Sequence, residues 1–396
     1  MQSATALSYE LDDLEAAAGE LAAAIKEKLS LKKNSLGVLF CDAECDGAAL
    51  SAELEKLLGI TIGGMTTLAE LENSGHHEGA LVLTVLTADD CFFSPVVSAS
   101  LIGNNYDERI GDAYKASAQA AGGYGEKPAF MFAFCPPGMA FSGDKFPEAL
   151  SKAVQNVPII GGISSDDYDY KTARVFLSGK AYWDSLVLIS VWGKVKPLFS
   201  LHHVTSRFAE RIRRVVKATD NKVYTVGDET LVKYLESFGL RTDVSDVLLA
   251  FTSYPMMLTS EKGDETPLMR HLTGLDLKDG SGTFVGDVPE GLMANICMVN
   301  KNDVMAACRE SMEALLEETK KQQDYQYSTI FCISCCGRAM ILGADSGAEG
   351  QILSELLPKG LNLAGAYCLG EICPVKYKDG EVSNRFHNCS ITFCAV

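Results

Sequence analysis

Apolar and polar residues follow one another along this chain in patterns that predict helices and strands in regular succession. The first helix is predicted over residues 9–29, where apolar side chains recur at spacings of three and four: Leu11, Leu14, Ala18, Leu21 and Ile25. The apolar run LGVLF at 36–40 predicts a buried strand. Residues 79–93 and 172–193 are β-rich and predict hairpin-like segments, the second with a tight turn at Ser178-Gly179.

One arrangement of these elements occurs three times, at residues 37–67, 128–167 and 327–372. Each copy is an apolar strand that ends in cysteine and small or polar residues, then a loop, a leucine-rich helix and a short strand that ends at glycine. This order predicts crossover units whose loops lie on one side of a sheet. We therefore expect an α/β fold of mixed sheets flanked by helices. The pattern leaves open whether two sheets stack as a sandwich.

The length of 396 residues exceeds what one ordinary core needs, which indicates two domains. We place the boundary near residue 222, giving modules at 1–222 and 223–396. The hydrophobic share of 47% and charged share of 22% are typical of a soluble globular protein.

Charge and targeting signals limit which binding partners and which cellular compartment we expect. The formal net charge of −17 disfavours nucleic acid and anionic membranes as partners. The acidic N-terminus lacks the apolar stretch of a secretory signal, and no apolar run reaches the roughly 18 residues of a membrane helix. We therefore expect a cytoplasmic protein whose 13 cysteines are reduced thiols.

A glycine pair marks a first candidate binding element. Gly161 and Gly162 follow a predicted strand and precede Ser164 and Asp166. Glycines let a ligand approach the main chain closely, although a plain turn at a strand end has the same appearance. The pair matches neither GxGxxG nor GxxxxGK(S/T), the two glycine-rich motifs that bind phosphate, so it does not indicate a nucleotide.

A second candidate is the cysteine-rich stretch FCISCCGRAMILG at residues 331–343. Its cysteines, Cys332, Cys335 and Cys336, could belong to a zinc site, a redox pair or the packed wall of a pocket. Zinc sites generally use two paired CxxC-like units, which this chain lacks, so packing is favoured. On a strand, Cys332 and Cys335 face opposite sides because side chains alternate.

Three polar residues near predicted strand ends complete the candidate site. Arg338 follows Gly337, where its guanidinium could reach into a cleft and bind a carboxylate or phosphate. Glu371 and Asn388 occupy similar positions farther along the chain. Each could instead be solvated or held in a salt bridge.

Several segments resemble the FIST family, named for F-box and intracellular signal-transduction proteins. VPIIGGISSDD (157–167), residues 172–193 and residues 202–235 resemble the N-terminal FIST module. CCGRAMILG (335–343), GAYCLGEICP (365–374) and FHNCSITF (386–393) resemble the C-terminal module, in the same order.

This resemblance implies a sensory domain for signal transduction that binds small molecules, with amino acids as one suggested class. Some bacterial relatives are similar to haem-containing nitric-oxide sensors paired with histidine kinases. The resemblance covers nearly the whole chain and leaves no room for an output domain. We therefore expect signalling through a separate protein, such as a histidine kinase.

Three functions remain open at this stage. The favoured one is a ligand sensor without a cofactor, whose site is formed by Gly161, Gly162, Ser164, Asp166, Arg338, Glu371 and Asn388. A haem or metal sensor is the alternative, with ligands from the Cys332–Cys336 group and from His202, His203 and His387. An enzyme with a cysteine nucleophile at Cys41, Cys135 or Cys336 is less favoured, because no clear Cys–His pairing is present.

Overall fold

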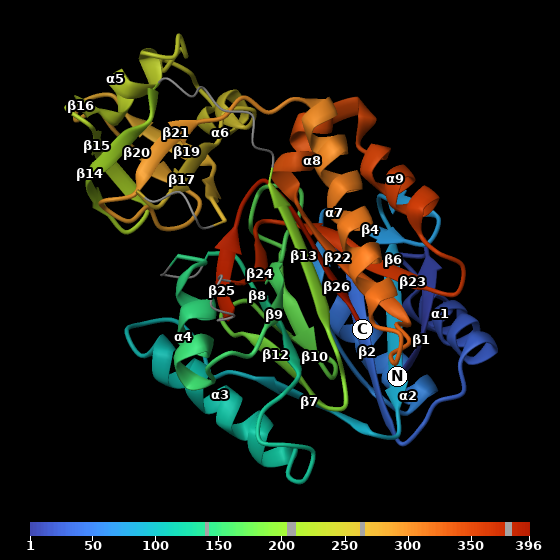
Figure 1. The fold of residues 1–396 in the computed structure, drawn as a ribbon. Helices are drawn as coiled ribbons and strands as arrows, with labels where there is room; N and C mark the ends of the chain where they lie inside the picture. Colours follow the sequence, from blue (N-terminus) through green and yellow to red (C-terminus); the bar gives the residue numbers. More distant parts are fainter. Residues whose placement is uncertain (139–141, 204–210, 262–265, 377–381) are drawn as a thin grey trace.

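The computed structural model describes residues 1–138, 142–203, 211–261, 266–376 and 382–396, so residues 204–210 of the FIST-like segment 202–235 lie outside it. The chain has two parts in space (Figure 1). Residues 1–203 and 300–396 form what we call the main body. Residues 211–299 form an inserted subdomain at one end of it, drawn at the upper left.

The main body contains three six-stranded sheets. The order of the first is β1 (Gln2–Ser8), β6 (Leu81–Ala88), β2 (Asn34–Asp42), β3 (Thr61–Thr67), β10 (Val175–Leu177) and β11 (Lys180–Tyr182). The order of the second is β25 (Val382–His387), β24 (Glu371–Lys376), β9 (Ile159–Ile163), β8 (Phe130–Cys135), β12 (Val187–Gly193) and β7 (Cys91–Val97). The order of the third is β13 (Leu198–His203), β26 (Ser390–Ala395), β22 (Thr329–Cys335), β23 (Asn362–Cys368), β4 (Ala69–Glu72) and β5 (Gly75–His77).

Helices cover the outer face of each of these sheets. They are α1 (Leu14–Lys28) and α2 (Gly47–Leu58) on the first, α3 (Tyr106–Ala120) and α4 (Lys145–Ala153) on the second, and α7 (Lys301–Lys321), α8 (Cys336–Leu342) and α9 (Ala348–Leu356) on the third. The inner faces pack on one shared core, where Phe40 contacts Phe134 and Phe132 contacts Phe331. The predicted α/β class with mixed sheets flanked by helices is confirmed, with three sheets around one core.

The three predicted strand–helix–strand units each form a parallel pair: β2 with β3, β8 with β9, and β22 with β23. One glycine in each of the three second strands packs against the backbone of its parallel partner. A β-carbon at Gly64, Gly161 or Gly365 would lie 1.8, 1.9 or 2.1 Å from a carbonyl oxygen of the neighbouring strand. Only glycine permits this approach, so the glycines serve strand packing.

Short hairpins link the three sheets to one another. The hairpin β4–β5 follows the first unit but pairs in the third sheet, β10–β11 follows the second unit but pairs in the first, and β24–β25 follows the third unit but pairs in the second. In addition, β13 pairs with β26, the last strand of the chain. Segments far apart in sequence therefore share sheets throughout the main body.

The inserted subdomain has its own sheet and its own core. Its elements are β14 (Arg213–Thr219), β15 (Lys222–Val226), β16 (Glu229–Thr230), α5 (Leu231–Glu236), α6 (Val247–Phe251), β17 (Met256–Thr259), β18 (Leu268–Arg270), β19 (Leu272–Asp276), β20 (Ser281–Phe284) and β21 (Met293–Ile296). Residue 222, where the first predicted module ends, is the first residue of β15. The division into modules at 1–222 and 223–396 stays a prediction.

Two local expectations are corrected. The helix predicted over 9–29 begins at Leu14, and an unpredicted strand, β1, precedes it. Residues 79–93 do not form a hairpin, because β6 pairs with β1 and β2 whereas β7 pairs with β12. The predicted turn at Ser178-Gly179 is confirmed and joins β10 to β11, with φ angles of 48° and 76°.

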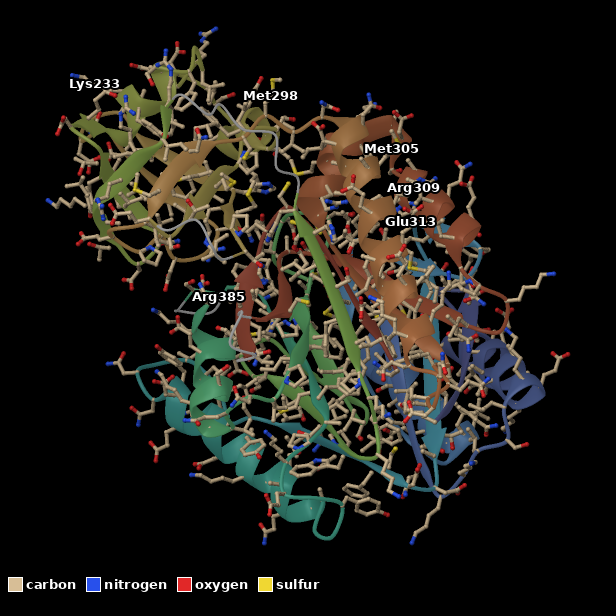
Figure 2. All side chains as sticks on the ribbon, in the orientation of Figure 1. Lys233, Met298, Met305, Arg309, Glu313 and Arg385 are labelled. Carbon is tan, nitrogen blue, oxygen red and sulfur yellow. The ribbon has the colours of Figure 1, made fainter. Side chains whose placement is uncertain are left out.

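The longest described helix, α7, lies on the outside of the main body with Met305, Arg309 and Glu313 along it (Figure 2). Met298 lies where the inserted subdomain joins this helix. Within the described residues, no helix combines the length and the apolar character that crossing a membrane requires.

Candidate ligand-binding site

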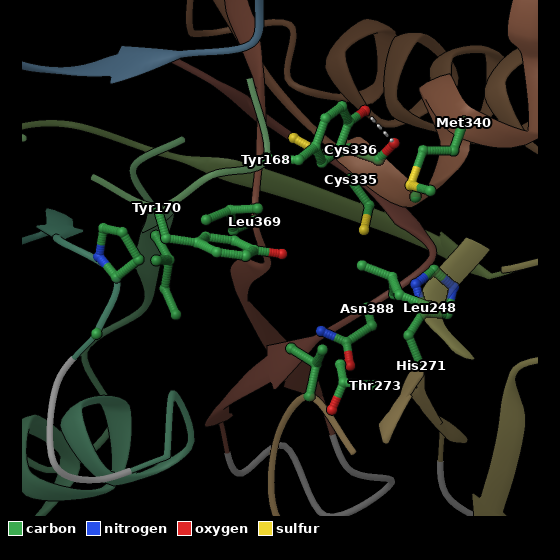
Figure 3. Close-up of a pocket in the computed structure, with 15 residues that line it drawn as sticks. Tyr168, Tyr170, Leu248, His271, Thr273, Cys335, Cys336, Met340, Leu369 and Asn388 are labelled. Atoms are coloured by element: carbon green, nitrogen blue, oxygen red, sulfur yellow. Dashed lines mark hydrogen bonds between the residues drawn. The ribbon is translucent and has the colours of Figure 1, made fainter. Parts of the chain in front are cut away.

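A pocket of about 490 Å³ lies between the main body and the inserted subdomain (Figure 3). Its lining residues are Pro137, Gly138, Ile163, Tyr168, Tyr170, Leu248, His271, Thr273, Val285, Cys335, Cys336, Gly337, Met340, Leu369 and Asn388. Within the described part of the chain, this lining includes no lysine, arginine, aspartate or glutamate. Mostly apolar walls with a few neutral polar groups are typical of small-molecule sites.

The main body contributes the ends of the parallel strands. Pro137 and Gly138 follow β8, Cys336 and Gly337 follow β22, and Leu369 follows β23. Loops of two predicted crossover units therefore meet at one pocket. The corresponding loop of the first unit lines a different cavity, of about 290 Å³, that includes residues 43–48.

The inserted subdomain contributes the opposite wall through α6 and the strands near His271. The His271 ring lies against Gly337, because a β-carbon there would be only 2.1 Å from Cε1 of the imidazole. Burial lowers the pKa of His271 to about 4, so the ring is neutral at physiological pH. Its Nε2 has no hydrogen-bond partner among the described residues.

A loop at residues 166–173 brings two tyrosines to the pocket. The buried Asp166 carboxylate accepts hydrogen bonds from the backbone N–H groups of Tyr170 and Thr172, both at 3.0 Å. Although burial alone raises its pKa, these bonds hold the pKa of Asp166 below its usual value. Tyr168 and Tyr170 adopt φ angles of 67° and 60°, which are uncommon for tyrosine. Asp166 thus stabilises a strained loop.

The two tyrosines have different contacts. The Tyr168 hydroxyl donates to the carbonyl oxygen of Cys336 at 3.3 Å, which joins the loop to the start of α8. The Tyr170 side chain reaches into the pocket from one side (Figure 3), and the residue is 46% exposed. Burial raises the pKa of Tyr170, so its phenol is neutral.

A buried ion pair fixes the inserted subdomain beside this pocket. Arg270 at the end of β18 is fully buried and donates from Nη2 to Asp144 Oδ1 at 2.7 Å. Its Nη1 donates to the carbonyl oxygen of Phe386 at 3.2 Å. A second ion pair, from Lys145 to Asp287 at 2.7 Å, lies nearby. Both link the subdomain to the N-terminal end of α4.

The predicted glycines and serine lie behind the pocket wall. Gly161 packs against β8 as described above, and a β-carbon at Gly162 would lie 2.6 Å from the Cys368 sulfur. Ser164 is fully buried, and its backbone N–H donates to Cys135. None of the three lines the pocket, although Ile163 between them does.

The Arg338 side chain points away from the pocket, contrary to our expectation. It is fully buried, and Nη2 donates to Glu349 Oε1 at 2.6 Å and to the carbonyl oxygen of Val304 at 2.9 Å. Glu349 also accepts from the hydroxyl of Tyr367. Arg338 therefore ties α8 to α7 and α9, and the preceding Gly337 is the residue that reaches the pocket.

Glu371 and Asn388 lie closer to the pocket. The fully buried Glu371 accepts a hydrogen bond from Ser390 at 2.5 Å, and burial raises its pKa to about 8, so it is mostly protonated at neutral pH. Of the residues predicted for the ligand sensor's site, Asn388 is the one among the described lining residues. Its Nδ2 donates to the carbonyl oxygen of His387, and its buried Oδ1 has no partner among the described residues.

The cysteines are all buried. Burial raises the pKa of the Cys41, Cys135 and Cys336 thiols, which opposes formation of the thiolate that a nucleophile needs. Cys332 packs in the core with α7, whereas Cys335 lines the pocket, so the predicted opposite orientation is confirmed.

The histidines predicted for haem or metal binding lie outside the pocket. His203 and His387 are buried, with ring centroids 5.2 Å apart, and burial lowers both of their pKa values. His202 is not among the lining residues either. In the described ranges, no three His, Cys, Asp or Glu side chains are grouped so that they could hold a metal ion.

Sequence reasoning missed most of the pocket. The missed residues that matter most are Tyr168, Tyr170, Leu248, His271 and Met340. The tyrosines had a detectable signal, since SSDDYDY directly follows the glycine-pair strand. His271 and Leu248 had none, because they reach the pocket only through the placement of the inserted subdomain.

Comparison with protein families gives two matches. A model described as the FIST N domain matches residues 35–229, and one described as the FIST C domain matches residues 229–374. Together they span most of the chain. No curated protein matches the sequence.

Comparison with solved structures gives matches of low similarity. One, reported as "Cyanuric acid hydrolase: evolutionary innovation by structural concatenation", has 9% identity and a TM-score of 0.36, with 100% of both chains covered. Another, a cyanuric acid hydrolase from A. caulinodans, has 9% identity and a TM-score of 0.33, covering 100% of this chain and 99% of the other. Scores at this level carry no inference about activity.

Proposed function

Because the chain belongs to the FIST family, with an N domain followed by a C domain, we propose that it is a sensory protein whose ligand binds between the main body and the inserted subdomain. FIST domains are generally small-ligand sensory domains of signalling proteins. The observation that carries the proposal is the position of the 490 Å³ pocket, which is lined from both parts.

A ligand in this pocket changes the contacts between the two parts. It would touch α8 of the main body and α6 of the inserted subdomain at the same time. Any difference in its affinity for closed and open arrangements shifts the equilibrium between them. The position of the inserted subdomain is therefore the signal that we propose.

The lining indicates an uncharged ligand. A carboxylate or ammonium group taken out of water needs an opposite charge, and the described lining offers none. We therefore propose a neutral, largely apolar molecule in place of the amino acid or anion that the sequence suggested. Arg338, which was the expected anion partner, is neutralised by Glu349.

Haem fits this site less well than a neutral, largely apolar molecule does. His271 offers a neutral ring nitrogen in apolar surroundings, as an axial ligand requires. The described lining, however, has no cationic side chain to pair with the two propionates. The proposal therefore includes no cofactor.

The proposed output is a protein–protein signal in the cytoplasm. A change in the position of the inserted subdomain would be read by a separate protein, such as a histidine kinase. This part of the proposal rests on the family alone, since no feature of the described surface selects a particular partner.

A thermal-shift screen combined with a blocking variant tests the proposal. Neutral, anionic and zwitterionic compounds of up to roughly 20 heavy atoms would be screened, and bound species confirmed by native mass spectrometry. Leu248→Trp fills the pocket, and Leu249→Trp is the matched control, because Leu249 is 64% exposed and does not line the pocket. We expect hits with the wild type and the control but not with Leu248→Trp. Hits that persist in Leu248→Trp would place the ligand elsewhere.

A further inference from the structure

Resting on the proposed function, we infer that the ligand is a planar, uncharged heteroaromatic molecule that stacks on the ring of Tyr170. Three features of the pocket point to this class. They are a tyrosine ring carried by a fixed loop on one side, sulfur and aliphatic groups on the other, and two neutral polar side chains with a buried atom that has no partner among the described residues.

The backbone that carries the Tyr170 ring is fixed by its own loop. Left-handed φ angles at two tyrosines are unfavourable unless the surroundings impose them. Asp166 imposes them with hydrogen bonds from Tyr170 N–H, from Thr172 N–H and hydroxyl, and from Ala173 N–H. Tyr170 is 46% exposed, and its side chain lies along the pocket. A ring on a preorganised backbone gives contact area without the entropy cost of ordering the loop.

The opposite side of the pocket is formed by soft, apolar groups. Figure 3 shows Met340 and Leu248 across from Tyr170, with the Cys335 sulfur between them. Sulfur atoms make favourable contacts with aromatic rings at about 5 Å. In Figure 3 the hydroxyl end of Tyr170 points toward this side, so a flat ring stacked on a face of Tyr170 would present its edge to the sulfur and aliphatic groups.

Polar atoms without partners indicate what the edge of the ligand carries. His271 Nε2 and Asn388 Oδ1 are both buried, and neither has a hydrogen-bond partner among the described residues. Unpaired buried groups of this kind cost free energy. Both atoms are covered in this structure, so a ligand with its own N–H or ring nitrogen recovers that cost once the imidazole or the amide turns toward the pocket. Because the imidazole is neutral, such a ligand needs no charge.

Binding of three probes separates this class from its competitors. Indole is planar, neutral and carries one N–H; cyclooctanol has the same number of carbons but is not planar; indole-3-carboxylate is planar but charged. Dissociation constants would be measured by isothermal titration calorimetry. We expect indole to bind at least about fivefold more tightly than either of the others, as a stacking contact of the usual strength implies.

Variants at Tyr170 test whether its ring makes the stacking contact with indole. Tyr170→Leu should weaken indole binding by about fivefold to tenfold, whereas Tyr170→Phe, which keeps the ring, should remain within about twofold of the wild type. Tyr9→Leu is the matched control, because Tyr9 is 59% exposed and does not line the pocket. Unchanged melting temperatures and circular dichroism spectra establish that the variants are folded.

The outcomes distinguish this inference from the proposed function. Equal binding of cyclooctanol and indole, tighter binding of indole-3-carboxylate, or an unchanged affinity in Tyr170→Leu would overturn the planar, uncharged class while leaving the pocket as the ligand site. Binding of no probe and of no compound in the wider screen would overturn the proposed function, and this inference with it.

Discussion

The imidazole of His271 in the inserted subdomain packs against Gly337 of the main body, so closely that a β-carbon at Gly337 would lie 2.1 Å from Cε1 of the ring. Both residues line the pocket. The pair therefore sets how closely the subdomain approaches α8, and with it the width of the site.

Replacing Gly337 with alanine should push His271 away and destabilise the protein. Overpacking of this kind typically costs about 1–3 kcal/mol, measured as the free energy of unfolding in urea. Gly347→Ala is the control, since no atom lies within 4 Å of the added carbon there. If His271→Ala does not restore part of the stability of Gly337→Ala, the contact between the two residues is not the cause.

Removing the Asp166 carboxylate should release the tyrosine loop. Asp166→Ala leaves the N–H groups of Tyr170 and Thr172 without their acceptor and should cost about 1–3 kcal/mol. Amide hydrogen exchange at residues 168–173 should accelerate, while exchange in β9 stays slow. The neighbouring exposed Asp167→Ala should change neither quantity; a similar acceleration in both variants would show that Asp166 has no special role.

Breaking the ion pair of Arg270 should free the inserted subdomain. Asp144→Ala leaves a buried guanidinium without its carboxylate, which typically costs about 3–5 kcal/mol. We expect a larger radius of gyration by small-angle X-ray scattering and faster exchange around β18. Asp243→Ala, which breaks the exposed pair with Arg241, should have almost no effect. Unchanged scattering in Asp144→Ala would mean that other contacts hold the subdomain.

Glu371 should make the protein less stable as the pH rises. Its folded pKa of about 8 exceeds the ordinary value of a carboxyl group, so the folded state binds the proton more tightly than the unfolded state does. The contribution of Glu371 to the free energy of unfolding is complete at acidic pH and is lost as the pH rises from about 5 through 8. The free energy of unfolding then falls by up to about 1.4 kcal/mol per pH unit.

Urea unfolding from pH 5 to 9 measures this slope. Glu371→Gln keeps a neutral group of similar shape and cannot ionise, so the part of the slope that belongs to Glu371 should disappear. An identical pH profile in the wild type and in Glu371→Gln would show that Glu371 titrates normally.

The fold class and the repeated units of the main body could be predicted from the amino-acid sequence alone. Apolar runs and the recurring order of strand, helix and strand are local properties, and so are the glycines that let parallel strands approach each other. The resemblance to FIST modules likewise depended on short segments in a fixed order, and the family models confirm it.

The contacts between these elements could not be predicted from the sequence, because they depend on how the whole chain packs. The sequence suggested that Arg338 could face a cleft. In the structure, α9 places Glu349 beside it, and the two buried charges form an ion pair, because a buried charge without a partner is unfavourable. The β-rich segment 79–93 looked like one hairpin, but its strands join different sheets. The pocket itself needs Leu248 and His271, whose distance from α8 is set by packing of the inserted subdomain. Sequence patterns report which side of an element is buried, and they do not report what it is buried against.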